Sequence, residues 1–319
     1  MTSPTHSMHS YSVAFILAPH RSGSTLLDNL LASHPSVISV GEVDKLRAYA
    51  LQDRRQYDPQ QPLTCSCGEP VASCAFWKEV ERFLGTPLAD LSLQWPLVRY
   101  ARDSLSTPQR LLQRSGLALL KRRPALFRST VVQRAFHGRI GTRDNWRLFD
   151  AIHSASGAPC IVDASKATYR YRLLRNGNED SVRAIFLCRD YRAVTYSLMR
   201  RGLSMEEAVA KWRQGVRRIE EMVCDLPSDQ LFRVTYEELC RDPTTTIRRV
   251  WQYLRLHDCE IPEARSITGM HHISGSPSKV DPNRQMIRRD DSHVGAFDPA
   301  QLEYLRNSAY PYATRWGYN

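Results

Sequence analysis

Long apolar runs are absent from this chain of 319 residues. No stretch approaches the roughly 18 consecutive apolar residues expected of a membrane-spanning helix. The first ten residues are polar and do not place a charged region before an apolar one, as a secretory signal does. We therefore expect a cytoplasmic protein without an integral membrane segment, and a disordered tail over residues 1–10.

Acidic residues are scarce in one region of the chain. The segment from Arg99 to Arg147 contains twelve basic residues and only two acids, Asp103 and Asp144, although the formal net charge of the whole chain is only +11. A concentrated positive field favours anionic partners such as phosphates, acidic sugars or anionic lipid. Nucleic acid is disfavoured because the region has no helix-turn-helix or zinc-finger pattern and few interleaved aromatics. A solvated helical face explains the same charges equally well.

The eight cysteines fall into two groups. Five are scattered and are typical of small core residues or free thiols. Cys65, Cys67 and Cys74 are clustered, and three thiols would hold zinc if another part of the chain supplied a fourth ligand. Cys-x-Cys is not the usual spacing of a zinc knuckle, however. A disulfide to Cys74 is a second interpretation, and plain packing is favoured over both.

Apolar periodicity predicts an α/β fold. The run Ser12–Ala18 indicates a buried strand, and a helical leucine pattern that Pro35 ends follows it. Further strand-like runs occur at residues 160–163, 184–188 and 231–234, with helical patterns between them. Strands that alternate with helices predict a P-loop-type central parallel sheet flanked by helices. We expect a single domain over residues 11–319, with a mostly helical, basic insertion at about 50–150.

Two later helices carry clear start signals. Ser204 and Glu207 have the spacing of a capping box. Asp298 and Pro299 supply a cap and a first-turn proline for a final helix.

The loop after the first predicted strand is a candidate anion site. It reads Pro-His-Arg-Ser-Gly-Ser-Thr over residues 19–25, and the N–H groups of such a loop and the following helix can bind a phosphate. Aligned on a Walker A pattern, Ser24 replaces the lysine, and the cation is Arg21 instead. The missing lysine and the lack of an evident acidic partner for Mg²⁺ disfavour an ATP or GTP hydrolase. A planar guanidinium suits the oxygen that bridges phosphate and sulfate. The alternative is an ordinary turn that contains an arginine.

Two motifs resemble those of a known superfamily. Residues 18–27, followed by His34-Pro35, resemble the 5′-phosphosulfate loop of sulfotransferases that use PAPS (3′-phosphoadenosine 5′-phosphosulfate). The bacterial, carbohydrate and tyrosylprotein branches are the most similar. Residues 186–197 resemble the 3′-phosphate motif, with an arginine at a strand end and a helical serine eight residues later. The resemblance covers residues 12–45 and 160–295. It implies transfer of a sulfuryl group from PAPS to a hydroxyl acceptor, with release of PAP and no need for a metal.

The resemblance also implies nucleotide-binding residues. Those for the 5′-phosphosulfate are Arg21, Ser22, Gly23, Ser24 and Thr25, and those for the 3′-phosphate are Arg189 and Ser197. Tyr236 matches a tyrosine near the nucleotide, although it could equally be a core aromatic. Lys279 lies in the late loop expected to close over the nucleotide. The alternative for Arg189 is a salt bridge to Asp190 or another carboxylate.

Three residues are implied to be catalytic. Glu42 stands at the family's position for a carboxylate that takes the acceptor proton, a role worth roughly 10²–10⁴ in rate. Tyrosylprotein enzymes read Gly-Glu-Glu there, whereas this chain reads Gly-Glu-Val. Lys166 and Arg21 would neutralise charge on the transferring group, and Asp163 would orient the loop of Lys166. A surface carboxylate and an exposed loop lysine are the alternatives for Glu42 and Lys166.

Two other functions fit parts of the sequence. A P-loop kinase acting on a small molecule would need the missing Walker lysine. A non-catalytic protein would bind PAP or a polyanion without turnover. The sequence leaves the acceptor open among saccharides, lipid-linked sugars, peptide tyrosines and small metabolites, and the basic region favours an acidic or polymeric one. The main prediction requires that the two anion sites lie within reach of one nucleotide.

Overall fold

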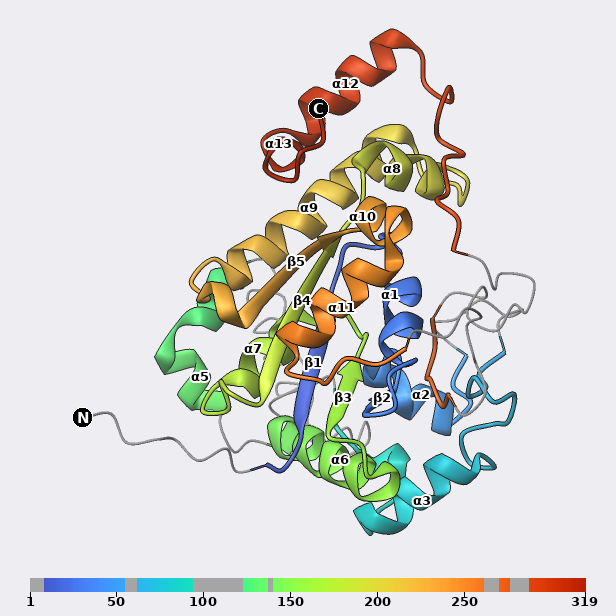
Figure 1. The fold of residues 1–319 in the computed structure, drawn as a ribbon, viewed down its shortest axis with the longest axis vertical. Helices are drawn as coiled ribbons and strands as arrows, with labels where there is room; N and C mark the ends of the chain where they lie inside the picture. The colour runs from blue at the N-terminus through green and yellow to red at the C-terminus, as the bar shows by residue number, and fades with distance from the viewer. Residues whose placement is uncertain (1–8, 55–61, 94–122, 137–139, 261–269, 276–286) are drawn as a thin grey trace, which may run out of the picture.

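A parallel sheet forms the centre of the molecule (Figure 1). The structure is a computed structural model that describes residues 9–54, 62–93, 123–136, 140–260, 270–275 and 287–319. Its five strands lie in the order β2-β3-β1-β4-β5, and all neighbouring pairs are parallel. The strands are β1 (Ser12–Leu17), β2 (Val37–Ser39), β3 (Cys160–Asp163), β4 (Val182–Cys188) and β5 (Leu231–Thr235). The predicted α/β fold with a central parallel sheet is confirmed.

Successive side chains of a strand point to opposite sides, so a continuous apolar run presents an apolar surface on each face of the sheet. Helices cover both faces. One face packs against α1 (Ser24–Leu31), α10 (Tyr236–Arg241) and α11 (Pro243–Tyr253). The other packs against α6 (Ile140–Ser156), α7 (Thr168–Arg175), α8 (Tyr191–Met199) and α9 (Met205–Val223). Burial on both faces explains why the strands read as continuous apolar runs.

Shorter elements surround these layers. The α-helices among them are α2 (Leu46–Ala50), α3 (Ala75–Leu84), α5 (Thr130–Phe136), α12 (Pro299–Ala309) and α13 (Tyr312–Arg315). The 3₁₀ turns are η1 (Val43–Lys45), η2 (Leu88–Asp90), η3 (Pro124–Arg128) and η4 (Ser228–Gln230). Within the described ranges, no helix combines the length and the apolar character needed to cross a bilayer.

The two predicted helix starts are confirmed. The Ser204 hydroxyl accepts from the backbone N–H of Glu207, whose carboxylate accepts from the N–H of Ser204, and α9 begins at the next residue. Asp298 caps α12 in the same reciprocal way with Gln301, and Pro299 occupies the first helical position.

The region of the predicted insertion shares the main core. Its described parts contain α3, α5 and the start of α6, and they add no strand to the sheet. Trp77 of α3 and Phe149 of α6 are buried in the same apolar cluster as Phe15 of β1. Residues 94–122, which hold six of the twelve basic residues, lie outside the described residues, as do residues 1–8 of the predicted tail.

Candidate active site

The predicted site residues converge on one edge of the sheet. Arg21 follows β1, Glu42 follows β2, Lys166 follows β3, Arg189 follows β4 and Tyr236 follows β5. Because all strands are parallel, their carboxyl ends lie along the same edge, where ligands bind in open α/β sheets. The topology therefore brings together residues from five separate parts of the sequence.

The backbone of the loop between β1 and α1 lets another group approach it closely. Gly23 has a φ of 85°, and a Cβ on this residue would lie 2.4 Å from Cδ2 of Tyr236. A glycine is therefore required by both backbone and packing. Ser24 begins α1, and Thr25 lies in its first turn. The hydroxyl of Ser22 is buried and has no hydrogen-bond partner among the described residues, so a ligand could use it.

The two predicted anion sites are in contact. The Nε–H of Arg21, in the loop after β1, donates to the Oγ of Ser197 on α8 over 3.0 Å. Arg21 was predicted to bind the 5′-phosphosulfate and Ser197 the 3′-phosphate. Their side chains touch although 176 positions separate them in the sequence.

Arg189 is buried at the end of β4 and pairs with a carboxylate. Its Nη2 donates to the backbone oxygen of Asp290 at 2.8 Å and to the carboxylate of Asp290 at 3.2 Å. Its Nε is also buried and has no partner within the described ranges. The neighbouring Asp190 pairs instead with Arg192 and caps α8. Asp290 is half exposed, so an incoming anion could displace it from Arg189.

Tyr236 links the two anion sites. Its ring lies against Gly23 on one loop, and the guanidinium of Arg189 stacks 4.3 Å from the ring centroid. Its hydroxyl accepts from the N–H of Asp290 at 3.1 Å. The ring is buried, as a core aromatic would be, yet each of these contacts is made to a residue of the candidate site.

Glu42 is held between two lysines. Its Oε1 accepts from Lys166 at 2.6 Å, and its Oε2 accepts from Lys45 and, at 3.2 Å, from Ser274. Burial alone would raise the pKa of Glu42, but the charges of Lys166 and Lys45 outweigh it and lower the pKa to about 2. The carboxylate is thus ionised, and both its oxygens are occupied. In this arrangement it is a weak general base until a lysine moves away.

A buried ion pair supports the loop of Lys166. Asp163, the last residue of β3, accepts from Arg170 at 2.8 Å and from the N–H of Ser165 at 2.8 Å. Both side chains of the Asp163–Arg170 pair are almost fully buried. This arrangement agrees with the orienting role predicted for Asp163.

Three residues with strained backbones lie in the site. Arg21, Lys166 and Ser274 have φ values of 66°, 60° and 57°, which non-glycine residues adopt at a cost. Such strain clusters at functional sites, where the surrounding structure enforces it. Here it occurs at both predicted catalytic cations.

Sequence reasoning missed several members of the site. Lys45 lies three residues after Glu42, a spacing that could have indicated an ion pair, whereas Ser274 and Asp290 approach from distant segments.

His20 was also overlooked. Partial burial lowers the pKa of His20, and the charges of Lys166, Lys211 and Lys45 lower it further against the charge of Glu42. The lowered pKa favours the neutral imidazole of His20. Lys279 lies outside the described residues.

Comparison with known proteins bears on the family and the fold. A sulfotransferase family model matches residues 172–260, which include Arg189, Ser197 and Tyr236. The sulfotransferase domain from the curacin biosynthetic pathway is 18% identical, with coverage of 97% of this chain and 98% of that chain and a TM-score of 0.56. The sulfotransferase domain from the Synechococcus PCC 7002 olefin synthase is 19% identical, with coverage of 98% and 97% and a TM-score of 0.50.

No curated protein matches the chain by sequence. At identities below 20%, the likeness to the two solved structures concerns the fold. Together with the family match, it confirms the resemblance that the two motifs predicted: the chain has the sulfotransferase fold, and its residues 172–260 carry the sequence pattern of the sulfotransferase family.

Proposed function

We propose that this protein transfers a sulfuryl group from PAPS to a hydroxyl acceptor and releases PAP. The contact between Arg21 and Ser197 is the main support, because it joins the loop after β1 to helix α8, which the resemblance assigns to opposite ends of one nucleotide. The position of Tyr236 against both Gly23 and Arg189 supports the same assignment.

In the proposed mechanism the protein mainly positions the reactants and neutralises charge, as in phosphoryl transfer. Ser22 and the N–H groups of the β1–α1 loop bind the 5′-phosphosulfate, and Arg189 binds the 3′-phosphate in place of Asp290. Arg21 and Lys166 stabilise the transferring group. The acceptor oxygen bonds to sulfur as the bond from sulfur to the bridging oxygen breaks, and Glu42 takes the acceptor proton.

Donor binding would also prepare the base. The sulfate of the donor would compete with Glu42 for Lys166, which at rest is bonded to Glu42 at 2.6 Å. Movement of Lys166 towards the sulfate would free one carboxylate oxygen and raise the pKa of Glu42, because the largest opposing charge is withdrawn. His20 is the alternative base, since its imidazole is held neutral beside the same cations.

The competing functions make different demands. A P-loop kinase would place a lysine where Ser24 begins α1 and would need Mg²⁺. A non-catalytic binder would hold PAP or a polyanion without turnover. The acceptor is expected to be hydroxylated, and the basic region favours an acidic or polymeric compound.

Thermal-shift measurements with PAP, ATP and a heparin-like polymer distinguish these functions. PAP at saturating concentration should raise the melting temperature, by mass action, more than ATP does. Turnover of labelled PAPS with a panel of acceptors, with and without added Mg²⁺, then tests catalysis. No stabilisation by PAP would overturn the proposal, and stabilisation without turnover across the panel would favour a non-catalytic binder.

A further inference from the structure

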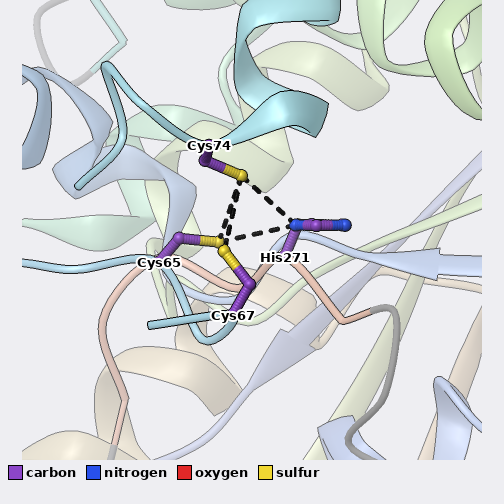
Figure 2. Close-up of side chains that lie close together, drawn as sticks. All are labelled: Cys65, Cys67, Cys74 and His271. Carbon is purple, nitrogen blue, oxygen red and sulfur yellow. Dashed lines mark hydrogen bonds between the residues drawn. The ribbon is translucent and has the colours of Figure 1, made fainter. Parts of the chain in front are cut away.

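Three cysteines and a histidine meet outside the candidate active site (Figure 2). Cys65 and Cys67 come from the loop after α2, Cys74 precedes α3, and His271 comes from a segment about 200 residues further along the chain. Their Sγ and Nδ1 atoms all lie within 4.8 Å of one another. Cys65 and Cys74 are buried, whereas Cys67 is exposed.

Four of the six distances between these atoms match the edges of a zinc tetrahedron, and the other two are within 4.8 Å. Zinc–sulfur bonds of about 2.3 Å and zinc–nitrogen bonds of about 2.0 Å place sulfurs about 3.8 Å apart and sulfur about 3.5 Å from nitrogen. The Sγ of Cys74 lies 3.7 Å from that of Cys65 and 3.6 Å from that of Cys67. The Nδ1 of His271 lies 3.3 Å from Cys74 Sγ and 3.7 Å from Cys65 Sγ. We propose that Cys65, Cys67, Cys74 and His271 bind one structural Zn²⁺ ion.

The surrounding contacts hold the ligands in place. The ring of His271 stacks on Phe76 with centroids 4.8 Å apart and an interplanar angle of 12°, and its carbonyl accepts from Trp77 Nε1 at 3.1 Å. The N–H of Gly68 donates to the carbonyl of Cys65 and closes a tight turn between two ligands. Such contacts outside the ligand set fix ligand orientation in metal sites. Four protein ligands leave no open position, which is typical of structural rather than catalytic zinc.

A disulfide accounts for the cluster less well. A disulfide bond joins its sulfurs at about 2.05 Å, and the structure separates two pairs equally without bringing either into bonding distance. A disulfide between Cys67 and Cys74 would also leave Cys65 and His271 without a shared role. Zinc uses all four groups, and its binding releases the thiol protons to solvent.

The proposed metal would anchor a wall of the active site. Beyond His271, the backbone of Ile273 bonds to Val40 and Glu42, at 3.0 and 2.8 Å, beside the end of β2. The next residue, Ser274, donates to the Glu42 carboxylate. Zinc would therefore tie the loop of residues 65–74 to the segment that contacts Glu42. The inference itself depends only on the cluster and not on sulfuryl transfer.

Metal analysis of the full chain tests the proposal. Protein purified without chelators should contain about one zinc ion per chain, as a closed four-ligand site requires. Inductively coupled plasma mass spectrometry measures the zinc content. Cys67→Ser removes an exposed ligand with little disturbance of packing, and after dialysis against a competing chelator it should have lost most of its zinc. The matched control is Cys224→Ser, which changes an exposed thiol at the end of α9 and should keep its zinc.

Cobalt substitution tests the site in the wild-type chain, so the result does not depend on whether a variant folds. Co²⁺ should produce thiolate-to-metal charge-transfer absorption and the intense visible bands of a tetrahedral site. Hydrogen exchange of residues 270–275 should also speed up when the metal is removed. The proposal is overturned by wild-type protein that neither contains nor takes up zinc, by a disulfide between Cys67 and Cys74 in peptide mapping, or by Cys67→Ser protein that retains zinc as the control does.

Discussion

The guanidinium of Arg21 donates to the hydroxyl of Ser197 over 3.0 Å, so that a loop and a helix far apart in the sequence share one hydrogen bond. The Ser197 hydroxyl keeps Arg21 in place before any ligand arrives. A bound donor would compete for the same guanidinium. The pair is therefore a natural place to test the proposed nucleotide site.

Arg21→Ala should reduce kcat by about 10²–10³, the usual effect of removing a group that stabilises developing charge. Arg21→Lys keeps the charge but loses the Nε–H and the planar fork, so turnover should remain well below that of the wild type. Labelled PAPS provides the assay. Arg82→Ala is the control, because Arg82 is exposed on α3 and pairs with Glu79 within the same helix. Full activity of Arg21→Ala would reject its role.

Asp290→Asn should tighten PAP binding. The carboxylate of Asp290 occupies Arg189, which we assign to the 3′-phosphate, and a bound phosphate would have to displace it. Because Asp290 is half exposed and screened by solvent, its ion pair with the buried Arg189 is worth about 0.2–1 kcal/mol, which corresponds to a gain of up to roughly fivefold in affinity. Calorimetric titration with PAP measures the change. Asp291→Asn removes a neighbouring carboxylate that pairs with Arg289 and should leave Kd unchanged. Weaker binding by Asp290→Asn would contradict the assignment.

Gly23→Ala should destabilise the fold and abolish PAP binding. The added Cβ would lie 2.4 Å from Cδ2 of Tyr236, in addition to the strain of a φ of 85°. Gly177→Ala is a matched control, since Gly177 has a φ of 77° and an added Cβ would meet nothing within 4 Å. Backbone strain alone costs about 1–3 kcal/mol, so denaturant unfolding should show a larger loss for Gly23→Ala. Equal losses would show that the Tyr236 contact is easily relieved.

The pH profiles of kcat/KM and kcat should differ in the pH at which activity falls on the acid side. The value of kcat/KM reports the free enzyme, in which Lys166 and Lys45 hold the pKa of Glu42 at about 2 against the effect of burial. Glu42 should therefore cause no loss of kcat/KM at any pH where the fold survives. The value of kcat reports the complex, in which Lys166 is drawn to the donor, so its acid limb should lie at higher pH. If kcat and kcat/KM fell at the same acid pH, donor binding would not be drawing Lys166 away from Glu42.

Glu42→Gln tests the base directly. If Glu42 takes the acceptor proton, the variant should lose about 10²–10⁴ in kcat while PAP still binds. His20→Ala should then have a much smaller effect. The reverse pattern would assign the proton to His20, whose imidazole is neutral near pH 7.

Asp44 should make the fold less stable as the pH rises. Burial raises the pKa of Asp44 from 3.8 to about 7, partly offset by the charge of Arg170. The folded chain thus keeps a proton that the unfolded chain releases at lower pH, so stability is lost between about pH 4 and pH 7. Asp44→Asn removes this titration, and its stability relative to wild type should increase over that interval. A constant difference between pH 4.5 and pH 8 in urea unfolding would refute the effect.

Local patterns in the sequence were enough to predict the main strands and the two helix starts. The apolar runs of β1, β3, β4 and β5 reflect burial on both faces. The Ser204–Glu207 box is an interaction within a single helical turn. β2 was missed because its three residues are too few to show a period. The Arg21 loop and the Arg189 motif were also found, since each is a continuous segment next to a strand.

Tertiary structure decided which of these segments meet. The sheet order places β4 between β1 and β5, and so brings Ser197, on the helix after β4, to Arg21 after β1, and Arg189 to Tyr236 after β5. No local pattern encodes a strand order, because it depends on how crossovers pack their helices on the two faces. For the same reason the sequence could present three clustered cysteines but not His271, which reaches Cys74 from 197 positions away. The sequence determined the chemical groups, and the fold determined their partners.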